Sequence, residues 1–201
     1  MLDRIAHALV SIPAVYDLVQ NLAGQQKLAA RLRQTLTSLP AGRMVDVGSA
    51  GGGMADRLGI APVYVDIDVR PLLARRHRVP AARLVGADGC RMPFPAGGFD
   101  TAICLFVSHH LSDAELALFV EELARVTSGA LFFVDAVRND ARWISRLMWR
   151  YDRGRNPRTK TQILAALCAG FELADVSDFT TYHQYVLCVA RPRRSERDAR
   201  P

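Results

Sequence analysis

The sequence has few cysteines and no long apolar run. Its four cysteines, Cys90, Cys104, Cys168 and Cys188, are single and widely spaced, so no CxxC pair is available for a zinc site. No apolar run approaches the roughly 20 residues that cross a bilayer. Residues 1–15 contain Asp3, Arg4, His7 and Pro13, which make a poor secretory signal. We therefore expect no metal site and a reducing, cytoplasmic location.

The chain also lacks the composition of a disordered protein. Half of its 201 residues are apolar, which is enough to bury the core of a single domain. Lysine and arginine number 26 against 20 acidic residues, a formal net charge of +6. This excess could serve nucleic acid, an anionic membrane surface or an acidic substrate, so its position along the chain must decide.

Short apolar runs alternate with helical stretches from residue 43 onward. The pattern predicts strands at 44–47, 63–67, 83–85, 101–107 and 130–134, with helices that include 113–126 and 161–169. Two more strands, 171–176 and 182–190, have no helix between them and predict an antiparallel hairpin at one edge. The alternation predicts an α/β fold whose mostly parallel, seven-stranded sheet has helices on both faces. Residues 1–40 show two earlier helical patterns, ending at Pro40.

A glycine-rich stretch follows the first expected strand. Residues 45–53 read Val-Asp-Val-Gly-Ser-Ala-Gly-Gly-Gly and precede a helix expected over 54–58. Small residues let the backbone turn sharply and approach an anionic ligand, and an acid about 20 positions later can bind ribose hydroxyls. Asp66 and Asp68 both stand at the end of the second strand. The loop alone fits a degenerate dinucleotide fingerprint, an S-adenosylmethionine (SAM) loop, or a turn that only packs a helix.

A second block of motifs distinguishes these alternatives. Residues 86–89 read Gly-Ala-Asp-Gly, then follow Met92-Pro93-Phe94-Pro95, Phe99-Asp100, and a strand that ends in Ser108-His109-His110-Leu111. From Met44 to about Leu131 the chain resembles the class I SAM-dependent methyltransferases, and is most similar to the branch that includes quinone and small-molecule methyltransferases. A nicotinamide enzyme has no reason to carry this second block. The resemblance implies a Rossmann-like class I methyltransferase fold, with SAM as cofactor and S-adenosylhomocysteine as product.

The resemblance also implies a role for individual residues. Asp46 and Gly48 would lie near the methionine end of SAM, Asp66 would accept hydrogen bonds from the ribose, and Asp88 from the adenine amino group. The other implied cofactor contacts are Ser49, Ala50 and Gly52 in the turn, Ile67 after the ribose acid, Gly89 beside Asp88, and Leu105 near the methionyl group. Ala50 departs from the family, which usually has a second glycine there. Asp68 we interpret instead as a capping or solvated residue, and Asp100 as structural.

The methyl group of SAM is already activated by its bond to a positively charged sulfur, so the protein has to supply few catalytic groups. The main task is to align the acceptor and exclude water, and a base is needed only where the acceptor loses a proton. His109 and His110, near the end of the fourth strand, are the candidate bases. Tyr16 is a third candidate, because the amino-terminal helices, here residues 1–40, often cover the active site in this superfamily. The chain has no motif for adenine amino-methylation and no Pro-Cys pair for a cytosine-methylating nucleophile.

The positive charge is concentrated after the fifth strand. Residues 138–160 carry eight basic residues against Asp140 and Asp152, and the tail at 191–201 has five arginines against two acids; we expect that tail to be disordered. Arg138, Arg142 and Arg146 begin a run spaced by four, which predicts one helical face. Segment 136–160 could be a solvated face over an apolar one, a site for an acidic or aromatic acceptor, or an interfacial helix for a lipid-like acceptor at a membrane. RNA contact is weaker, because no RNA-binding module is recognisable.

Together these patterns predict one SAM-binding domain over 41–190 that methylates oxygen, nitrogen or carbon of a small molecule by in-line displacement. Methylation of RNA or protein is the alternative among enzymes. A SAM-binding regulator or partner subunit without catalysis is the alternative outside them, and an oligomer could complete the acceptor pocket.

Overall fold

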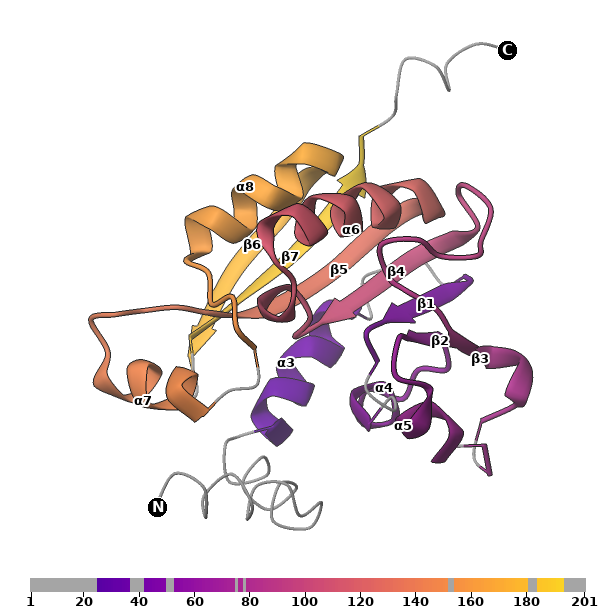
Figure 1. Ribbon diagram of the computed structural model, residues 1–201, viewed down its shortest axis with the longest axis horizontal. Coiled ribbons are helices and arrows are strands. Elements are labelled where there is room, and N and C mark those ends of the chain that lie inside the picture. Colours follow the sequence, from indigo (N-terminus) through magenta and orange to yellow (C-terminus); the bar gives the residue numbers. More distant parts are fainter. Residues whose placement is uncertain are drawn as a thin grey trace.

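The computed structural model describes residues 25–36, 42–49, 53–74, 76–77, 79–151, 154–180 and 184–193 (Figure 1). Its strands are β1 (Met44–Val47), β2 (Val63–Asp66), β3 (Leu84–Gly86), β4 (Phe99–Leu105), β5 (Thr127–Val137), β6 (Phe171–Thr180) and β7 (Gln184–Pro192). Its helices are α3 (Gln25–Leu36), α4 (Gly53–Leu58), α5 (Val69–Ala74), α6 (Asp113–Val126), α7 (Trp143–Tyr151) and α8 (Lys160–Gly170), with 3-10 turns η1 (Ala81–Arg83) and η2 (Ser108–His110).

The strands form one seven-stranded sheet in the order β3-β2-β1-β4-β5-β7-β6. The first five run parallel, and β7 pairs antiparallel with both β5 and β6. The prediction of a mostly parallel sheet with an antiparallel carboxy-terminal hairpin is confirmed. The chain leaves β1 toward β2 on one side and returns to β4 on the other, so the strand order reverses between β1 and β4. In open α/β sheets the carboxyl ends of the strands at such a reversal form the ligand-binding crevice.

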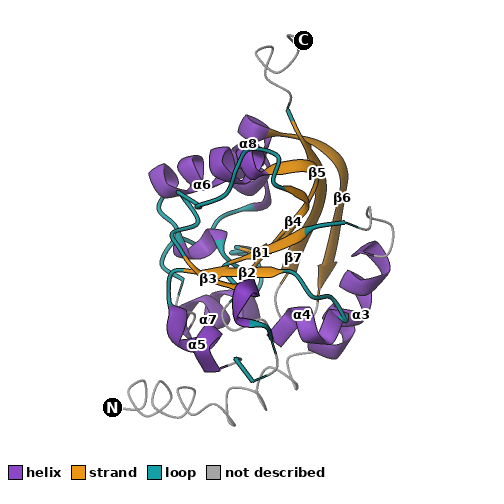
Figure 2. Ribbon diagram, turned by 90° about the vertical axis from the view of Figure 1, so that its right-hand side faces the viewer, coloured by secondary structure: helices purple, strands orange, loops and turns teal. Residues whose placement is uncertain are grey.

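Helices cover both faces of the sheet (Figure 2). On one face, α6 and α8 bury Leu116, Phe119, Val120, Leu123, Val126, Ile163 and Leu167 against the strands. On the other face, α3 and α4 contribute Leu32, Leu36 and Leu58 to a cluster with Ile103, Leu105, Phe132, Val134 and Leu187. The central strands are apolar on both sides because each face is covered, as expected of a parallel sheet.

Helix starts are well defined where capping residues stand. Ser112 caps α6 and Thr159 caps α8, each in a capping box with the third residue of its helix, Glu115 and Gln162 respectively. The prediction of 113–126 for α6 is confirmed to the residue. The helix α5 was not predicted, because Pro71 and only six residues leave no clear helical period.

Several sequence-based boundaries were wrong, most of them at strand ends. The strand expected to reach Val107 ends at Leu105, because Phe106 adopts a left-handed φ of 63° that no strand can contain. The tail expected from 191 begins later, since Arg191 and Pro192 belong to β7 and pair with β6. The second amino-terminal helix is α3, which ends at Leu36 and forms a layer of the core rather than only a cap over the site. The helix expected before residue 24 lies outside the described residues.

Candidate active site

The glycine loop begins at the carboxyl end of β1, directly beside β4. Gly48 has a φ of +75°, and a Cβ at this position would overlap Val107, so both the conformation and the space require glycine. The Gly48 and Ser49 amides both donate to the Val65 carbonyl, at 2.8 and 3.3 Å, which ties the loop to the end of β2. The Ser49 hydroxyl is buried and has no hydrogen-bond partner among the described residues. Such an orphaned polar group marks a place where a bound molecule can complete the loop.

Two acids at the end of β2 have different environments. The Asp66 carboxylate lies half-buried and accepts from the Asp68 amide at 2.9 Å, which fixes its orientation at the strand end. Asp68 forms an ion pair with Arg70 at 2.6 Å and also accepts from the Arg70 amide in the first turn of α5. These hydrogen bonds from Arg70 lower the pKa of Asp68 to about 2. Asp68 is therefore a capping residue, as expected, whereas Asp66, for which the sequence predicts a ribose contact, is half-buried at the strand end.

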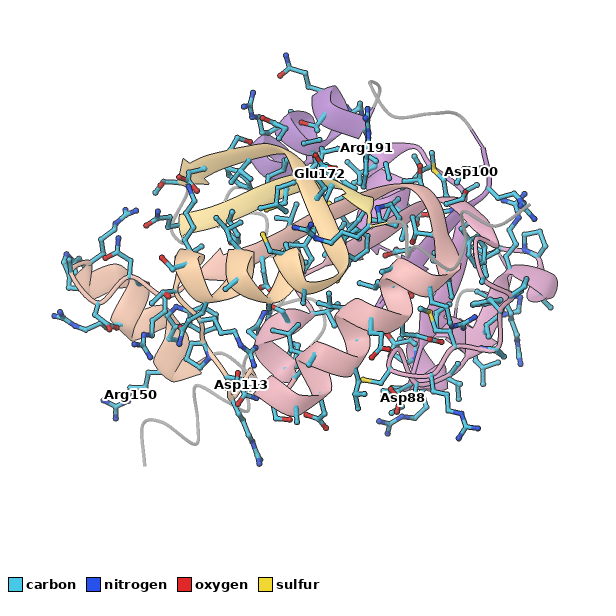
Figure 3. All side chains as sticks on the ribbon, turned by 90° about the horizontal axis from the view of Figure 1, so that it is seen from above. Asp88, Asp100, Asp113, Arg150, Glu172 and Arg191 are labelled. Carbon is cyan, nitrogen blue, oxygen red and sulfur yellow. The ribbon has the colours of Figure 1, made fainter. Side chains whose placement is uncertain are left out.

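The end of β3 brings a third acid to the same edge. Asp88 is exposed, and its Oδ1 accepts from the Cys90 amide at 2.9 Å, which fixes the turn after β3. Gly89 packs closely on Phe119 of α6 and on Val47 of β1, where a Cβ would approach Phe119 to 2.7 Å. Figure 3 shows Asp88 at the opposite side of the molecule from Arg150 of α7.

A partly exposed ion pair holds the loop that follows Asp88. Glu122 accepts from the Met92 amide at 2.6 Å and from Arg125 at 2.7 Å through each of its oxygens. Arg125 in turn donates to the carbonyls of Phe94 and Met92, at 2.8 and 3.2 Å. The hydrogen bond with Arg125 holds the pKa of Glu122 below its ordinary value, against the opposing effect of burial. This clamp joins α6 to residues 92–94 and so fixes the loop beside Asp88 and Gly89.

A strained residue, Phe106, follows the end of β4 directly. Phe106 has a left-handed backbone, a conformation that costs free energy in any residue with a side chain. Its amide donates to the Val134 carbonyl at 2.8 Å, and its ring lies 5.7 Å from that of Tyr185. The turn directs Val107 onto Gly48. The Leu105 side chain is buried in the α3-side cluster, so only its main chain is placed for the predicted cofactor contact.

The two adjacent histidines of η2 have opposite environments. His109 is 6% exposed, whereas His110 is an exposed side chain. The His109 Nδ1 lies 2.6 Å from Oδ1 of Asp135, a fully buried carboxylate in β5. Asp135 also accepts from the Ser108 hydroxyl and from the amides of His109 and Ala136. Because an ionised carboxylate only accepts, Nδ1 of His109 carries the proton and Nε2 is the basic nitrogen of the neutral ring.

Residues from the basic segment cover this pair. The Trp149 ring of α7 lies 5.6 Å from His109, and the Asn156 amide donates to the His109 carbonyl at 3.0 Å. Arg158 is 5% exposed and donates to the carbonyls of Ser108 and Leu111 and to the carboxylate of Asp113. The guanidinium of Arg158 therefore holds η2 in place.

The predicted helical face of arginines is shorter than expected. Arg138 and Arg142 precede α7, which begins at Trp143, and the Arg142 carbonyl accepts the first helical hydrogen bond, from Arg146. Arg138 is tied instead to residue 158 through a backbone hydrogen bond of 2.8 Å. Its side chain pairs with Asp140 at 3.3 Å.

The structure thus brings most predicted site residues to one edge of the sheet. Asp46, Gly48, Ser49, Asp66, Asp88, Gly89, Leu105 and His109 all lie at or just beyond the carboxyl ends of β1 to β4, as do Ile67 and His110. Tyr16, Ala50 and Gly52 lie outside the described residues. Asp100 is structural, as expected, since it accepts from the Arg43 amide at 2.7 Å and joins the beginnings of β4 and β1.

Sequence reasoning missed two residues of this site, Asp135 and Phe106. A signal for Asp135 was present, because a charged residue inside the apolar run of a buried strand must have a partner. Nothing in the sequence indicated the backbone of Phe106, since phenylalanine does not favour that conformation.

Comparison with known proteins gives one family and many similar folds. Residues 45–133 match the family model described as a methyltransferase domain. No curated protein matches the sequence. Geranyl diphosphate C-methyltransferase from Streptomyces coelicolor A3(2), solved with S-adenosyl-L-homocysteine, has a TM-score of 0.64 at 16% identity, over 84% of this chain and 81% of that one. Magnesium protoporphyrin IX methyltransferase from Synechocystis PCC 6803 gives 0.63 at 20% identity, over 84% of each chain. The cyclase SpnF gives 0.65 at 18% identity, over 85% of this chain and 82% of that one.

The match and the fold agree on one class of domain. Residues 45–133 match a methyltransferase domain, and the chain has the Rossmann-like fold of the SAM-dependent methyltransferases to which it is similar. The described residues fit the cofactor, because the orphaned Ser49 hydroxyl, the half-buried Asp66 and the exposed Asp88 follow the carboxyl ends of the neighbouring strands β1, β2 and β3. Bound there, SAM supplies a methyl group on a positively charged sulfur.

Proposed function

We propose that the protein methylates a small molecule that gives up a proton in the reaction. The buried pair of His109 and Asp135 carries this proposal. Methyl transfer to an acceptor that keeps all its protons needs only alignment and the exclusion of water. A histidine held in one tautomer by a buried carboxylate is useful where the acceptor must be deprotonated.

His109 acts as the base in this proposal. Its Nε2 takes the proton from the acceptor oxygen, nitrogen or acidic carbon, and the freed electron pair forms the new bond to the methyl group. Asp135 is a positioning residue, which holds the ring through Nδ1 and stabilises the imidazolium that forms. Ser108 keeps Asp135 oriented through its own hydroxyl. His110, whose ring lies 4.3 Å from that of His109 but whose side chain is exposed, is the second candidate base.

The enclosure of His109 favours a small acceptor. The imidazole is 6% exposed beneath Trp149 and residue 156, so a reacting group must enter a narrow space to reach it. A base in a nucleic acid or a side chain of a folded protein stays attached to its polymer, which would have to approach the site with it and would need a wider opening. Two structures with the same fold act, by name, on geranyl diphosphate and on magnesium protoporphyrin IX, which are both small molecules.

The direct test is the transfer of labelled methyl from SAM into a cell extract. After the reaction, the extract is separated into small-molecule, lipid, RNA and protein fractions. We expect label in the small-molecule or lipid fraction, and its loss with the His109→Gln variant. Label only in RNA or protein would overturn the proposed acceptor class. No label anywhere, with SAM binding intact, would indicate a SAM-binding protein without catalysis.

A further inference from the structure

We propose that α7 and the residue before it dock the protein on an anionic lipid bilayer. The docking surface, called the α7 face below, consists of Arg142, Trp143, Arg146 and Arg150. It lies beyond the carboxyl end of β5, where α7 stands apart from the helices that cover the sheet (Figure 1). Among the described residues no helix is long and apolar enough to span a membrane, so the contact in question is with the bilayer surface.

The helix α7 has two distinct faces. Ser145 and Trp149, four residues apart, point into the protein. Ser145 is 1% exposed and accepts from the Asn139 amide at 3.3 Å, and Trp149 contacts the ring of His109. Exposure defines the other side of the helix: Arg146 and Arg150 are exposed, and Arg142 is half-buried. The indole of Trp143, three positions from Arg146, is 65% exposed and lies with them at the surface.

Two arginines of the α7 face keep their positive charge. Arg142 and Arg146 form no ion pair with any residue in the described parts of the chain. Two acids of the described residues are engaged elsewhere, because Asp140 pairs with Arg138 and Asp113 with Arg158. Arg146 donates to the Asp140 carbonyl, which orients its guanidinium without neutralising it. Arg150 lies on the outer side of α7 in Figure 3, away from the sheet.

A lipid surface fits this combination better than a nucleic acid does. Tryptophan is enriched at membrane–water interfaces, where an apolar ring with one polar edge finds both environments. Arginine binds phosphate bidentately, and cations beside an amphipathic helix are attracted to anionic lipids. Single-stranded RNA is held by successive aromatic platforms in a basic groove. Among the described residues, the α7 face has one exposed aromatic side chain, Trp143, on the surface of a helix, and so lacks the series of aromatic rings that RNA needs.

The position of α7 suggests how an acceptor reaches the site. The inner face touches His109 through Trp149 while the outer face meets the bilayer, so an amphiphilic acceptor could pass from the lipid to the base along one helix. This delivery rests on the proposed function, whereas docking on the bilayer does not.

The test is co-sedimentation of the full chain with vesicles, without SAM or acceptor, so that its outcome is independent of catalysis. Vesicles of phosphatidylcholine alone are compared with vesicles that also contain phosphatidylglycerol. We expect binding only to the anionic vesicles, weakened by high salt and about 30-fold by Arg142→Gln with Arg146→Gln. The control pair, Arg76→Gln with Arg83→Gln, removes the same charge near β3, at the other edge of the sheet, and should bind as wild type. Equal loss in both pairs, or no binding by wild type, would overturn the proposal.

Tryptophan fluorescence gives a second readout, because both tryptophans of the chain are in α7. In a Trp149→Phe variant the signal comes from Trp143 alone. We expect its emission to shift to the blue on anionic vesicles and to be quenched by brominated lipids. An unchanged spectrum in vesicle-bound protein would show that another surface binds. Single-stranded RNA is added as a competitor. If RNA released the protein from the vesicles and shifted the Trp143 emission by the same amount, the α7 face would be assigned to RNA instead.

Discussion

At the scale of single residues, the two histidines of η2 should differ in their effect on catalysis. We expect His109→Gln to lower the rate of methyl transfer by about 10²–10⁴-fold, the usual contribution of a general base. His110→Gln is the matched control, because the side chain is exposed and one position away. The rates are measured with the acceptor fraction labelled from SAM, and SAM affinity is measured in parallel. Equal rates for the two variants would contradict the proposal that His109 is the general base.

Gly48 is the residue where the glycine loop tolerates no side chain. We expect Gly48→Ala to lower the free energy of unfolding by about 1–3 kcal/mol, since the left-handed backbone and Val107 both oppose a Cβ. Denaturant unfolding measures this loss. Gly53→Ala is the control, because a Cβ there meets nothing within 4 Å. If the two variants were equally stable, the requirement for glycine at 48 would be wrong.

At the scale of elements, the clamp between α6 and residues 92–94 should make stability depend on pH. The pKa of Glu122 is below its ordinary 4.5, so its carboxylate stabilises the fold above that pH and the contribution is lost as the pH falls below it. We expect Glu122→Gln to cost about 1.5–3 kcal/mol at neutral pH, the range for charged hydrogen bonds, and to differ little from wild type well below pH 4.

Unfolding curves for Glu122→Gln and for the exposed neighbour Glu121→Gln, recorded at both pH values, check the clamp. A loss of stability that stayed constant with pH, or that Glu121→Gln shared, would contradict it. The variant should also weaken SAM binding, because the clamp holds the loop beside Asp88.

Elements with local signals were predictable from the sequence, and those that depend on distant contacts were not. The capping residue Ser112 and the apolar period of α6 determine that helix within its own residues. The length of β4 depends instead on the turn at Phe106, whose amide bonds to β5. In the same way, the spacing of arginines predicted a helix from 138, but Arg138 is held by residue 158, twenty positions away.

At the scale of the whole molecule, the parallel order and the crevice at its reversal follow from the alternation of strands and helices. The position of the net charge also followed from the sequence, but its use did not. Arg138, Arg158 and Lys160 form ion pairs with Asp140, Asp113 and Asp178. The charge that faces outward is therefore smaller than the segment's composition suggests, and Arg142 and Arg146 carry part of it. The sequence gives the number of charged residues in this segment, whereas the structure shows which of them form ion pairs.

The central claim is that SAM occupies the crevice formed by the ends of β1, β2 and β3. Calorimetric titration with SAM tests it most directly, using Asp66→Asn, Asp88→Asn and the control Asp68→Asn, which alters an acid already paired with Arg70. Wild type should bind one SAM per chain, and Asp66→Asn and Asp88→Asn should each weaken binding by about tenfold or more, while Asp68→Asn binds as wild type. Absence of binding by wild type, or undiminished binding by both site variants, would contradict the claim.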